Sequence, residues 1–290
     1  MLEKKCNDVQ QCILSIVKYL DTFCRAHGIE YYLMGGSALG AMRHGGFIPW
    51  DDDLDVFMTV DNYDKFLVYF EKNGDKRFFL QKENTKEWPL FLSQICLSGT
   101  TMINKVWQQN HLQHHNVFVD IMCLYSTPKN IFKRSCHFYM AQLLRINALE
   151  QIGYPQRSLV KKIIMLLSNI LVNRFTRPMI IKYVRSYEGK ETEYVGHFFG
   201  RARFRNATFS RSYIGNTRYV PFEDTMLPVF EHVEDYLVAR YGSKWMDMPD
   251  KKTMDMYSQH GDFVDLHRDY TEYLTPDKKK WKDNIKYNWE

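Results

Sequence analysis

Several common signals are missing from this chain of 290 residues, and each absence excludes a class of protein. The six cysteines form no C-x-x-C pair, which favours buried free thiols in a reducing compartment over a disulfide framework. No segment approaches the roughly 18 consecutive apolar residues that a membrane-spanning helix needs. The opening MLEKKCNDVQ lacks the apolar core of a signal peptide. We therefore expect a cytoplasmic protein.

Charge and composition do not point to nucleic acid. The formal net charge of +5 is small for this length, and no strand pattern offers the aromatic platform of an RNA-binding sheet. Neither a P-loop motif nor a G-x-G-x-x-G fingerprint is present. Apolar residues make up 45% of the chain, which is enough for a packed core and excludes a disordered protein.

The first half of the chain alternates helix and strand patterns. Amphipathic spacing predicts a helix over residues 2–26, and Ser37 is expected to cap a second helix over residues 38–44. Asp61 is expected to cap a third. Strands are expected at residues 31–34, 54–58, 77–81, 90–97, 100–104 and 117–124. This order predicts an α+β fold, with a mixed β-sheet core flanked by helices.

The composition changes near residue 128. Residues 129–185 contain 11 Lys and Arg but one acid, Glu150, and helical patterns cover residues 132–149, 159–172, 179–187 and 227–241. We divide the chain into a catalytic core (1–128), a basic, mainly helical region that completes the substrate site (129–275) and an exposed tail (276–290). The basic helices are either an ordinary subdomain or a surface in peripheral contact with the cytoplasmic membrane leaflet.

Four aspartates stand within five residues at 51–55. If the segment is a strand, Asp53 and Asp55 project from one face about 7 Å apart, and their repulsion would be relieved by a hard cation such as Mg²⁺ or Mn²⁺. An EF-hand loop is excluded because Val56 and Asn62 stand where it needs Gly and Glu. Asp51 and Asp52 also fit a solvated acidic turn.

A further carboxylate, Asp120, interrupts the apolar strand pattern VFVDIMCL. A buried aspartate is often tied to a helix cap or an arginine, but beside Asp53 and Asp55 a third metal ligand is the better interpretation. Three carboxylates on two strands are able to hold two divalent cations about 3.5–4 Å apart, as phosphoryl transfer requires.

Candidate substrate-binding residues stand just before the aspartates. Gly35, Gly36 and Ser37 form a turn before a helix, where backbone N–H groups can receive a phosphate. Arg43 and His44 are positioned in the sequence to neutralise a diphosphate or protonate a leaving group. The Trp50 ring is one of several that could face a quaternary ammonium group.

The string GGSALGAMRHGGFIPWDDDLDVFM resembles the LicD family, within the nucleotidyltransferase (polymerase β-like) superfamily. That family shares a Gly-Gly-[Ser/Thr] turn, an Arg-His-x-Gly-Phe-Ile-Pro-Trp-Asp-Asp-Asp-[Leu/Ile]-Asp run and a later [Ile/Val]-Asp-Ile strand. The segments CRAHGIEYYLMGG and LPVFEHVEDYLVARYGSKWMDMPD also look typical of it.

The resemblance implies transfer of a substituted phosphate, phosphocholine being favoured, from a CDP-activated donor to a hydroxyl of a cell-surface glycan precursor. The donor would be CDP-choline, CDP-ribitol or CDP-glycerol, and the acceptor a glycan that is lipid-linked in some members. By matching position, Asp53, Asp55 and Asp120 would ligate the metal, and Gly36 and Ser37 would seat the donor phosphates. Asp51 and Asp52 would support them or activate the acceptor.

The sequence departs from the family pattern at two places. A Lys is often found near Ser93 or Gln94, and Gly is usual where Asn116 stands. These departures leave open which residues beyond Arg43 contact the phosphates.

Two alternative functions also remain. One is a nucleotidyltransferase that moves NMP from an NTP to a small molecule, protein or RNA, and the other is an inactive carbohydrate-binding relative.

Overall fold

The protein was analysed as a computed structural model that describes residues 7–104, 113–255, 260–275 and 281. The expected tail, residues 276–290, falls outside the described residues except for Trp281. Within the described part no helix is both long enough and apolar enough to cross a membrane.

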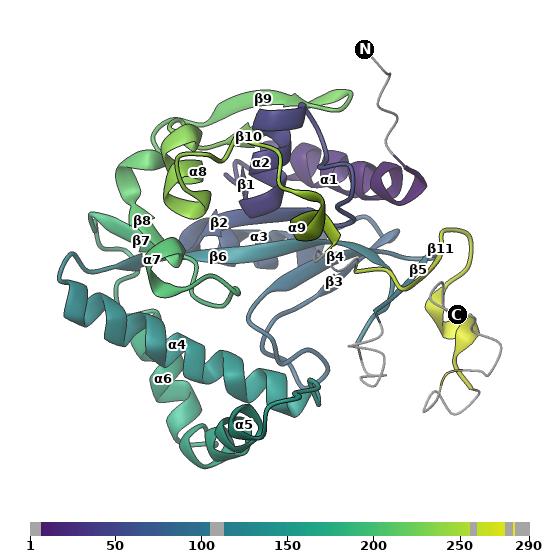
Figure 1. The fold of residues 1–290 in the computed structure, drawn as a ribbon. Coiled ribbons are helices and arrows are strands. Elements are labelled where there is room, and N and C mark those ends of the chain that lie inside the picture. The colour runs from purple at the N-terminus through teal and green to yellow at the C-terminus, as the bar shows by residue number, and fades with distance from the viewer. Residues whose placement is uncertain (1–6, 105–112, 256–259, 276–280, 282–290) are drawn as a thin grey trace.

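A mixed sheet forms the centre of the molecule (Figure 1). Its strands follow the order β1 (Tyr32–Leu33), β2 (Asp55–Thr59), β6 (Val117–Thr127), β4 (Ser93–Leu97) and β3 (Phe78–Gln81). Only β2 and β6 run parallel, and the other neighbours are antiparallel. The far half of β6 pairs with β7 (Tyr194–Gly196), which pairs with β8 (Thr208–Ser210). The predicted α+β class with a mixed sheet is confirmed.

The N-terminal helices pack directly on this sheet. Helix α1 (Asp8–Ala26) begins with a capping box between Asn7 and Gln10 and buries the apolar stripe that its sequence predicts. It packs on β6 and β4, whereas α3 (Val60–Asn73) packs on β2 and β6. Helix α2 (Gly35–His44) lies between β2 and the hairpin of β9 (Arg218–Phe222) and β10 (Thr225–Val229).

The basic region begins with three helices, α4 (Ile131–Gln151), α5 (Leu159–Leu171) and α6 (Thr176–Val184). They lie below the sheet in Figure 1, with α5 at the edge of the molecule. The chain then adds α7 (Phe204–Ala207), η1 (Arg211–Tyr213), α8 (Val233–Tyr241), α9 (Lys251–Asp255) and η2 (Tyr270–Tyr273). Strands β5 (Thr101–Ile103) and β11 (Phe263–Asp265) pair separately. Because β7 and β8 extend the main sheet, the regions predicted at 1–128 and 129–275 share it.

One predicted helix is wrong at its beginning. Residues 227–229 belong to β10, and only Val233–Tyr241 is helical. Pro228 has no amide hydrogen and is unfavourable inside a helix, but it is tolerated in the two-stranded β9–β10 hairpin. Glu223, with φ of 53°, makes the turn that returns the chain.

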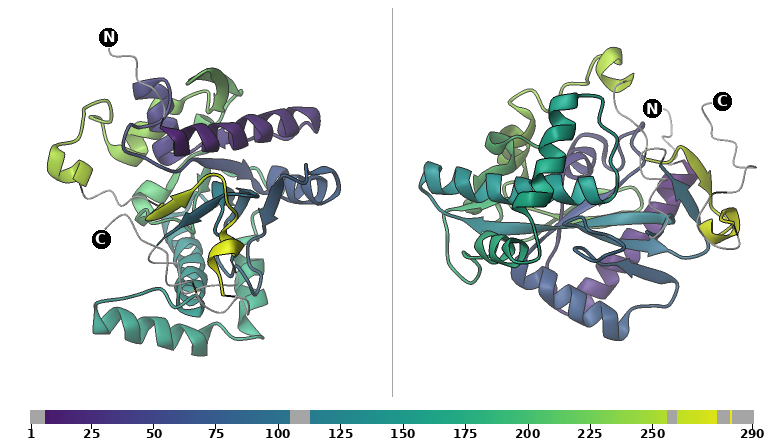
Figure 2. Two further views of the ribbon diagram at one scale, coloured as in Figure 1. Left: turned by 90° about the vertical axis from the view of Figure 1, so that its right-hand side faces the viewer. Right: turned by 90° about the horizontal axis from the view of Figure 1, so that it is seen from below.

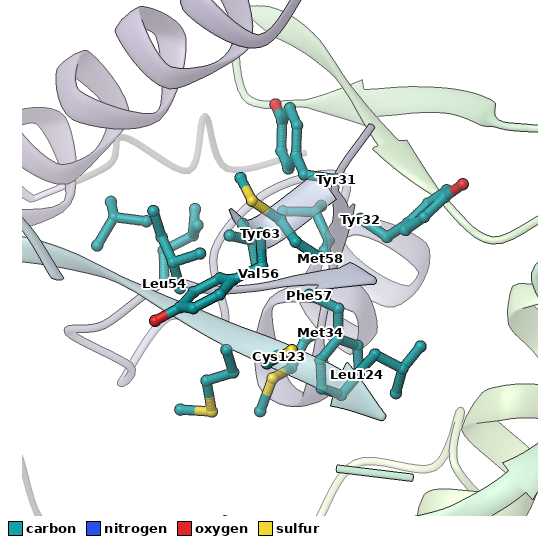
Figure 3. Close-up of a cluster of buried hydrophobic side chains, with 14 of the residues drawn as sticks. Tyr31, Tyr32, Met34, Leu54, Val56, Phe57, Met58, Tyr63, Cys123 and Leu124 are labelled. Atoms are coloured by element: carbon teal, nitrogen blue, oxygen red, sulfur yellow. The ribbon is translucent and has the colours of Figure 1, made fainter. Parts of the chain in front are cut away.

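The core is densest where β2 crosses the molecule. Figure 3 shows apolar side chains of β1 and β2 gathered with Cys123 and Leu124 of the adjacent strand β6. Phe57 is only 1% exposed, and its ring contacts those of His197, Phe230 and Tyr236. Phe57 therefore joins the central strand to segments that lie more than 130 residues later.

Truncation of Phe57 should be costly because the cavity would lie under three packed segments. We expect Phe57→Ala to lower the free energy of unfolding by about 3–5 kcal/mol. Val68→Ala on α3, where the side chain is 49% exposed, should change it by less than about 0.5 kcal/mol. Urea unfolding followed by circular dichroism would measure both. Equal losses in the two variants would contradict this account of the core.

Candidate active site

The parallel pairing of β2 with β6 places Asp55 directly opposite Asp120. Neighbouring strands are about 4.8 Å apart, so these two side chains project from the same face of the sheet at close range. Burial and the Asp120 carboxylate raise the pKa of Asp55 to about 8. Burial likewise raises the pKa of Asp120, to about 7, although the hydrogen bond from Gln94 opposes this.

Asp53 precedes the strand, because β2 begins at Asp55 rather than at the expected residue 54. Burial, and then the charge of Asp55, raise the pKa of Asp53 to about 6. Its Oδ2 lies 3.3 Å from Nε2 of His260. The structure therefore brings Asp53, Asp55 and Asp120 together, as the sequence suggests, with Asp53 held by the preceding loop.

Asp52 is buried and binds a distant segment. Its carboxylate accepts hydrogen bonds from the backbone N–H groups of His260 (2.8 Å) and Gly261 (2.9 Å), and His260 Nδ1 lies 3.1 Å from Oδ1. Burial raises the pKa of Asp52, but the hydrogen bonds from His260 and Gly261 outweigh it and leave the pKa below its usual value. Asp52 is thus a structural clamp rather than part of a solvated turn.

His260 lies between two of the aspartates. Burial opposes its protonation, but the hydrogen bond to Asp52 and the charges of Asp53 and Asp52 raise its pKa to about 10. No motif in the sequence marks His260, and it stands 208 residues from Asp52. Sequence reasoning missed it because only the folded chain brings the two together.

The glycine turn packs against the aspartates. Helix α2 begins at Gly35, three residues before the expected start, and its N-cap is Met34 rather than Ser37. Ser37 Oγ instead accepts the N–H of Asp55 at 2.8 Å. A Cβ on Gly36 would lie only 3.0 Å from Asp51 Oδ2, so the absence of a side chain lets Asp51 approach this turn. Burial and the Asp53 charge raise the pKa of Asp51 to about 8.

The C-terminal region also holds this turn in place. Gly35 has φ of +52°, a conformation that favours glycine, and its N–H donates to Tyr236 Oη of α8 at 3.0 Å. Met34 N–H donates to the carbonyl of Asp55 at 3.0 Å. Gln10 of α1 donates to the carbonyls of Asp51 (2.8 Å) and Ile48 (3.2 Å). Three separate elements therefore fix the turn and the acidic segment relative to each other.

Arg43 is engaged with protein groups. Its guanidinium donates to the carbonyls of Trp245 (3.4 Å) and Asp247 (3.1 Å), and its Nε–H donates to Nε2 of His44. The His44 ring lies edge-on to the Trp50 ring at 6.3 Å. Arg43 thus joins α2 to the loop after α8. Its guanidinium group already donates hydrogen bonds to two backbone carbonyls of that loop.

Other basic side chains lie near the carboxylates. Arg240 of α8 lowers the pKa of Asp55, a smaller effect than the burial that raises it. His197 is 3% exposed, and burial, followed by the charges of Arg240 and Arg145, lowers its pKa to about 3. Its ring lies 5.3 Å from that of Phe57, two residues along β2 from Asp55. Neither His197 nitrogen has a hydrogen-bond partner in the described part of the chain.

We call Arg145, Arg201 and Arg240 the sheet-face arginines, because the charges of Arg240 and Arg145 act on His197, whose ring packs on Phe57 of β2. Burial and the charge of Arg201 lower the pKa of Arg145, so Arg145 and Arg201 repel one another. Within the described residues none of the three forms a salt bridge with an acid. Neighbouring cations without acidic partners favour an anion, which they would bind with charge-assisted hydrogen bonds. Sequence reasoning missed them because they come from three separate segments.

The two departures from the family pattern have structural roles. Gln94 donates to Asp120 Oδ1 (2.8 Å) and accepts from Gln81 (2.6 Å), which in turn accepts the N–H of His114. This chain orients the Asp120 carboxylate across three strands. Asn116 donates to the Thr100 carbonyl (2.7 Å) and to Asp269 Oδ2 (3.1 Å), and so attaches the C-terminal segment to β6.

Asp55 and Asp120 offer oxygen atoms of the kind that divalent cations prefer as ligands. Among the described residues no group of three or more His, Cys, Asp or Glu side chains is arranged to hold a metal ion. Mg²⁺, however, is usually held by one or two carboxylates together with substrate phosphates and water. The facing pair Asp55 and Asp120 supplies hard oxygen ligands, and their mutual repulsion is the penalty that a cation relieves.

Residues 28–148, which include the acidic segment and Asp120, match the family model described as LicD/FKTN/FKRP, nucleotidyltransferase domain. This match identifies residues 28–148 as a LicD-family domain. Over 247 residues the chain is 24% identical to the lipopolysaccharide cholinephosphotransferase LicD of Haemophilus influenzae, a match that covers 83% of this chain and 91% of the relative. A match of 51% over 45 residues relates it to the human ribitol 5-phosphate transferase FKRP, covering 16% of this chain and 9% of FKRP.

The LicD segment and the rest of the chain contribute different parts of the site. All five aspartates, the glycine turn and Gln94 lie within residues 28–148. His197, Arg201, Arg240 and His260 lie beyond it. The candidate site therefore also includes residues from the later part of the chain, beyond the LicD-family domain.

Loss of the Asp52 charge should release the segment at His260. In Asp52→Asn an amide N–H₂ replaces one of the two oxygens that face N–H donors, leaving donors unpaired at a cost of about 1–3 kcal/mol. We expect hydrogen exchange of the His260 and Gly261 amides to accelerate at least tenfold. Mass spectrometry of the exchanged protein would measure it.

Asp250→Asn is the matched control, because Asp250 accepts the N–H of Thr253 and, among the described residues, forms no hydrogen bond with His260 or Gly261. It should leave exchange at His260 and Gly261 unchanged. Wild-type protection of those amides in Asp52→Asn would show that Asp52 does not clamp them.

Proposed function

We propose that this chain transfers phosphocholine from CDP-choline to a hydroxyl of a lipopolysaccharide-type glycan, in a metal-dependent reaction. The facing carboxylates Asp55 and Asp120 carry the proposal, because such a pair suits phosphoryl transfer. The match along 91% of a lipopolysaccharide cholinephosphotransferase supports phosphocholine as the group transferred. The shorter match to a ribitol 5-phosphate transferase makes CDP-ribitol the next donor to test, followed by CDP-glycerol.

Asp55 and Asp120, with Asp53 beside them, would hold Mg²⁺ or Mn²⁺. When bound, this ion would neutralise charge on the donor diphosphate and on the departing CMP. Gln94 orients the Asp120 carboxylate, and Ser37 accepts the Asp55 N–H, so the ligands are held in place before substrate binds.

The chemistry is an in-line displacement. The acceptor oxygen forms a bond to the phosphorus that carries choline, while the bond from that phosphorus to the bridging oxygen breaks and CMP leaves with the electron pair. The hydroxyl proton must pass to a base. We assign this role to Asp51 because its carboxylate lies against Gly36 at the site, whereas both Asp52 oxygens already accept hydrogen bonds from His260 and Gly261.

The donor phosphates would lie between the glycine turn and the sheet-face arginines. Gly36 and Ser37 stand in the first turn of the ten-residue helix α2, whose N-terminal end is electropositive. Arg240 contributes positive charge near Asp55. Arg43 would support this site indirectly, by holding α2 against the loop after α8. The Trp50 ring, which lies edge-on to the His44 ring just before the acidic segment in the chain, is a candidate for the choline ammonium group.

Ligand binding should be metal-dependent and should require the facing carboxylates. With 1 mM CDP-choline and Mg²⁺, a Kd near 10 μM would stabilise the protein by about 2.7 kcal/mol, a rise in Tm of several degrees. EDTA, Asp55→Asn or Asp120→Asn should abolish the rise and reduce the lipopolysaccharide-dependent release of CMP at least 100-fold. Asp61→Asn, at an exposed acid of α3, is the matched control and should retain both.

The same titration distinguishes the alternatives. A rise with CDP-ribitol or CDP-glycerol alone would change the donor and retain the reaction. A rise with ATP alone would favour a nucleotidyltransferase. A cooperatively melting protein that responds to none of these ligands would contradict the proposed transferase.

The sheet-face arginines should contribute to affinity for the diphosphate. We expect Arg240→Gln or Arg145→Gln to raise the Kd of CDP-choline about 10- to 100-fold, the loss of one charge-assisted hydrogen bond. Binding of cytidine, which has no phosphate, should change little. Arg205→Gln, at an exposed arginine of α7, serves as the control. Isothermal titration would measure these constants, and an unchanged Kd in both variants would remove these arginines from the donor site.

A further inference from the structure

Helix α5 is folded with its apolar side outward. We call Leu159, Val160, Ile163, Leu166, Leu167 and Ile170 the α5 patch, and these side chains are between 49% and 74% exposed. A helix in contact with water normally presents charged residues to the solvent and buries its apolar stripe. An exposed apolar patch of this kind marks an interaction surface.

The inner face of α5 is polar. The one buried residue of the helix is Ser168, and Asn147 of α4 donates to Asn169 Oδ1 at 2.8 Å and to Ser168 Oγ at 3.5 Å. Arg177 of α6 donates to Asn147 Oδ1 at 3.1 Å. Polar contacts therefore join the three helices, and the inner side of α5 does not bury its apolar residues.

Charge identifies the kind of surface that would cover the patch. Arg157, Lys161, Lys162, Arg174 and Lys182 are exposed around it, and within the described chain no acid pairs with them. Residues 129–185 contain 11 Lys and Arg against Glu150 alone. An apolar face bordered by bases complements a bilayer with anionic headgroups.

A second copy of the chain is a poorer occupant. A two-fold interface would bring the α5 patch against itself, and Lys161 and Lys162 near their own counterparts. Crossing the membrane is also ruled out for this helix, since 13 residues extend only about 20 Å. Helix α5 is therefore suited to lie in the plane of the interface.

We propose that α5 docks this protein onto an anionic membrane surface, with the α5 patch inserted among the acyl chains and the flanking bases on the phospholipid headgroups. Figures 1 and 2 show α5 along the edge of the molecule away from the central sheet, where a flat surface can reach it. The proposal rests on this surface and stands whether or not the transferase proposal holds.

Vesicle sedimentation of the full chain tests this docking. We expect binding to vesicles of phosphatidylcholine with 30% phosphatidylglycerol, weaker binding in high salt, and little binding to phosphatidylcholine alone. Ile163→Ser with Leu167→Ser should weaken binding at least tenfold. Lys161→Gln with Lys162→Gln should weaken it roughly 30-fold.

The control variant is Val68→Ser with Met226→Ser, which removes two side chains of similar exposure, 49% and 45%, away from α5. It should bind as the wild type does, and matching thermal melts would show that each variant is folded. Failure to bind anionic vesicles at low salt would overturn the proposal, as would equal loss in the control. Light scattering that shows a dimer dissociated by the α5 variants, without vesicle binding, would assign the patch to a second copy instead.

Discussion

The parallel pairing of β2 with β6 is the constraint on which the rest of the site depends. It places Asp55 and Asp120 at the same level on one sheet face, where burial raises the pKa of both groups and the Asp120 charge raises that of Asp55 further. Such a pair is unfavourable unless cations or hydrogen-bond donors compensate it. The surrounding elements are arranged to supply that compensation.

Each compensating group comes from a different part of the chain. Gln94 donates to Asp120 from the neighbouring strand, and Ser37 accepts the N–H of Asp55 from the first turn of α2. His260 lies between Asp52 and Asp53. Arg240 adds positive charge from α8. The site is therefore a balance of charge built across the whole fold, although four of its five acids stand within residues 51–55.

The basic helices show how a local pattern can have two physical meanings. Alternating Lys, Ile and Leu over α5 predicted a helix, and the helix forms at Leu159–Leu171. Whether its apolar side faces the core or the exterior depends on the partner helix, because a polar Asn147 on α4 selects Ser168 as the buried contact. The pattern at residues 227–241 was misleading for a related reason, since Pro228 is better accommodated by hairpin pairing than by a helix.

The sequence by itself determined the α+β class and pointed to the LicD-family domain, because the aspartates and the glycine turn stand within one short string and Asp120 interrupts an apolar strand. Periodicity and charge are local properties of the sequence, so they can be interpreted without knowledge of the fold. Only the tertiary structure decided which strand faces which, and so which side chains meet. His260 meets Asp52 across 208 residues, and Tyr236 holds Gly35 across 201. Such contacts depend on how distant elements pack, which no local pattern records.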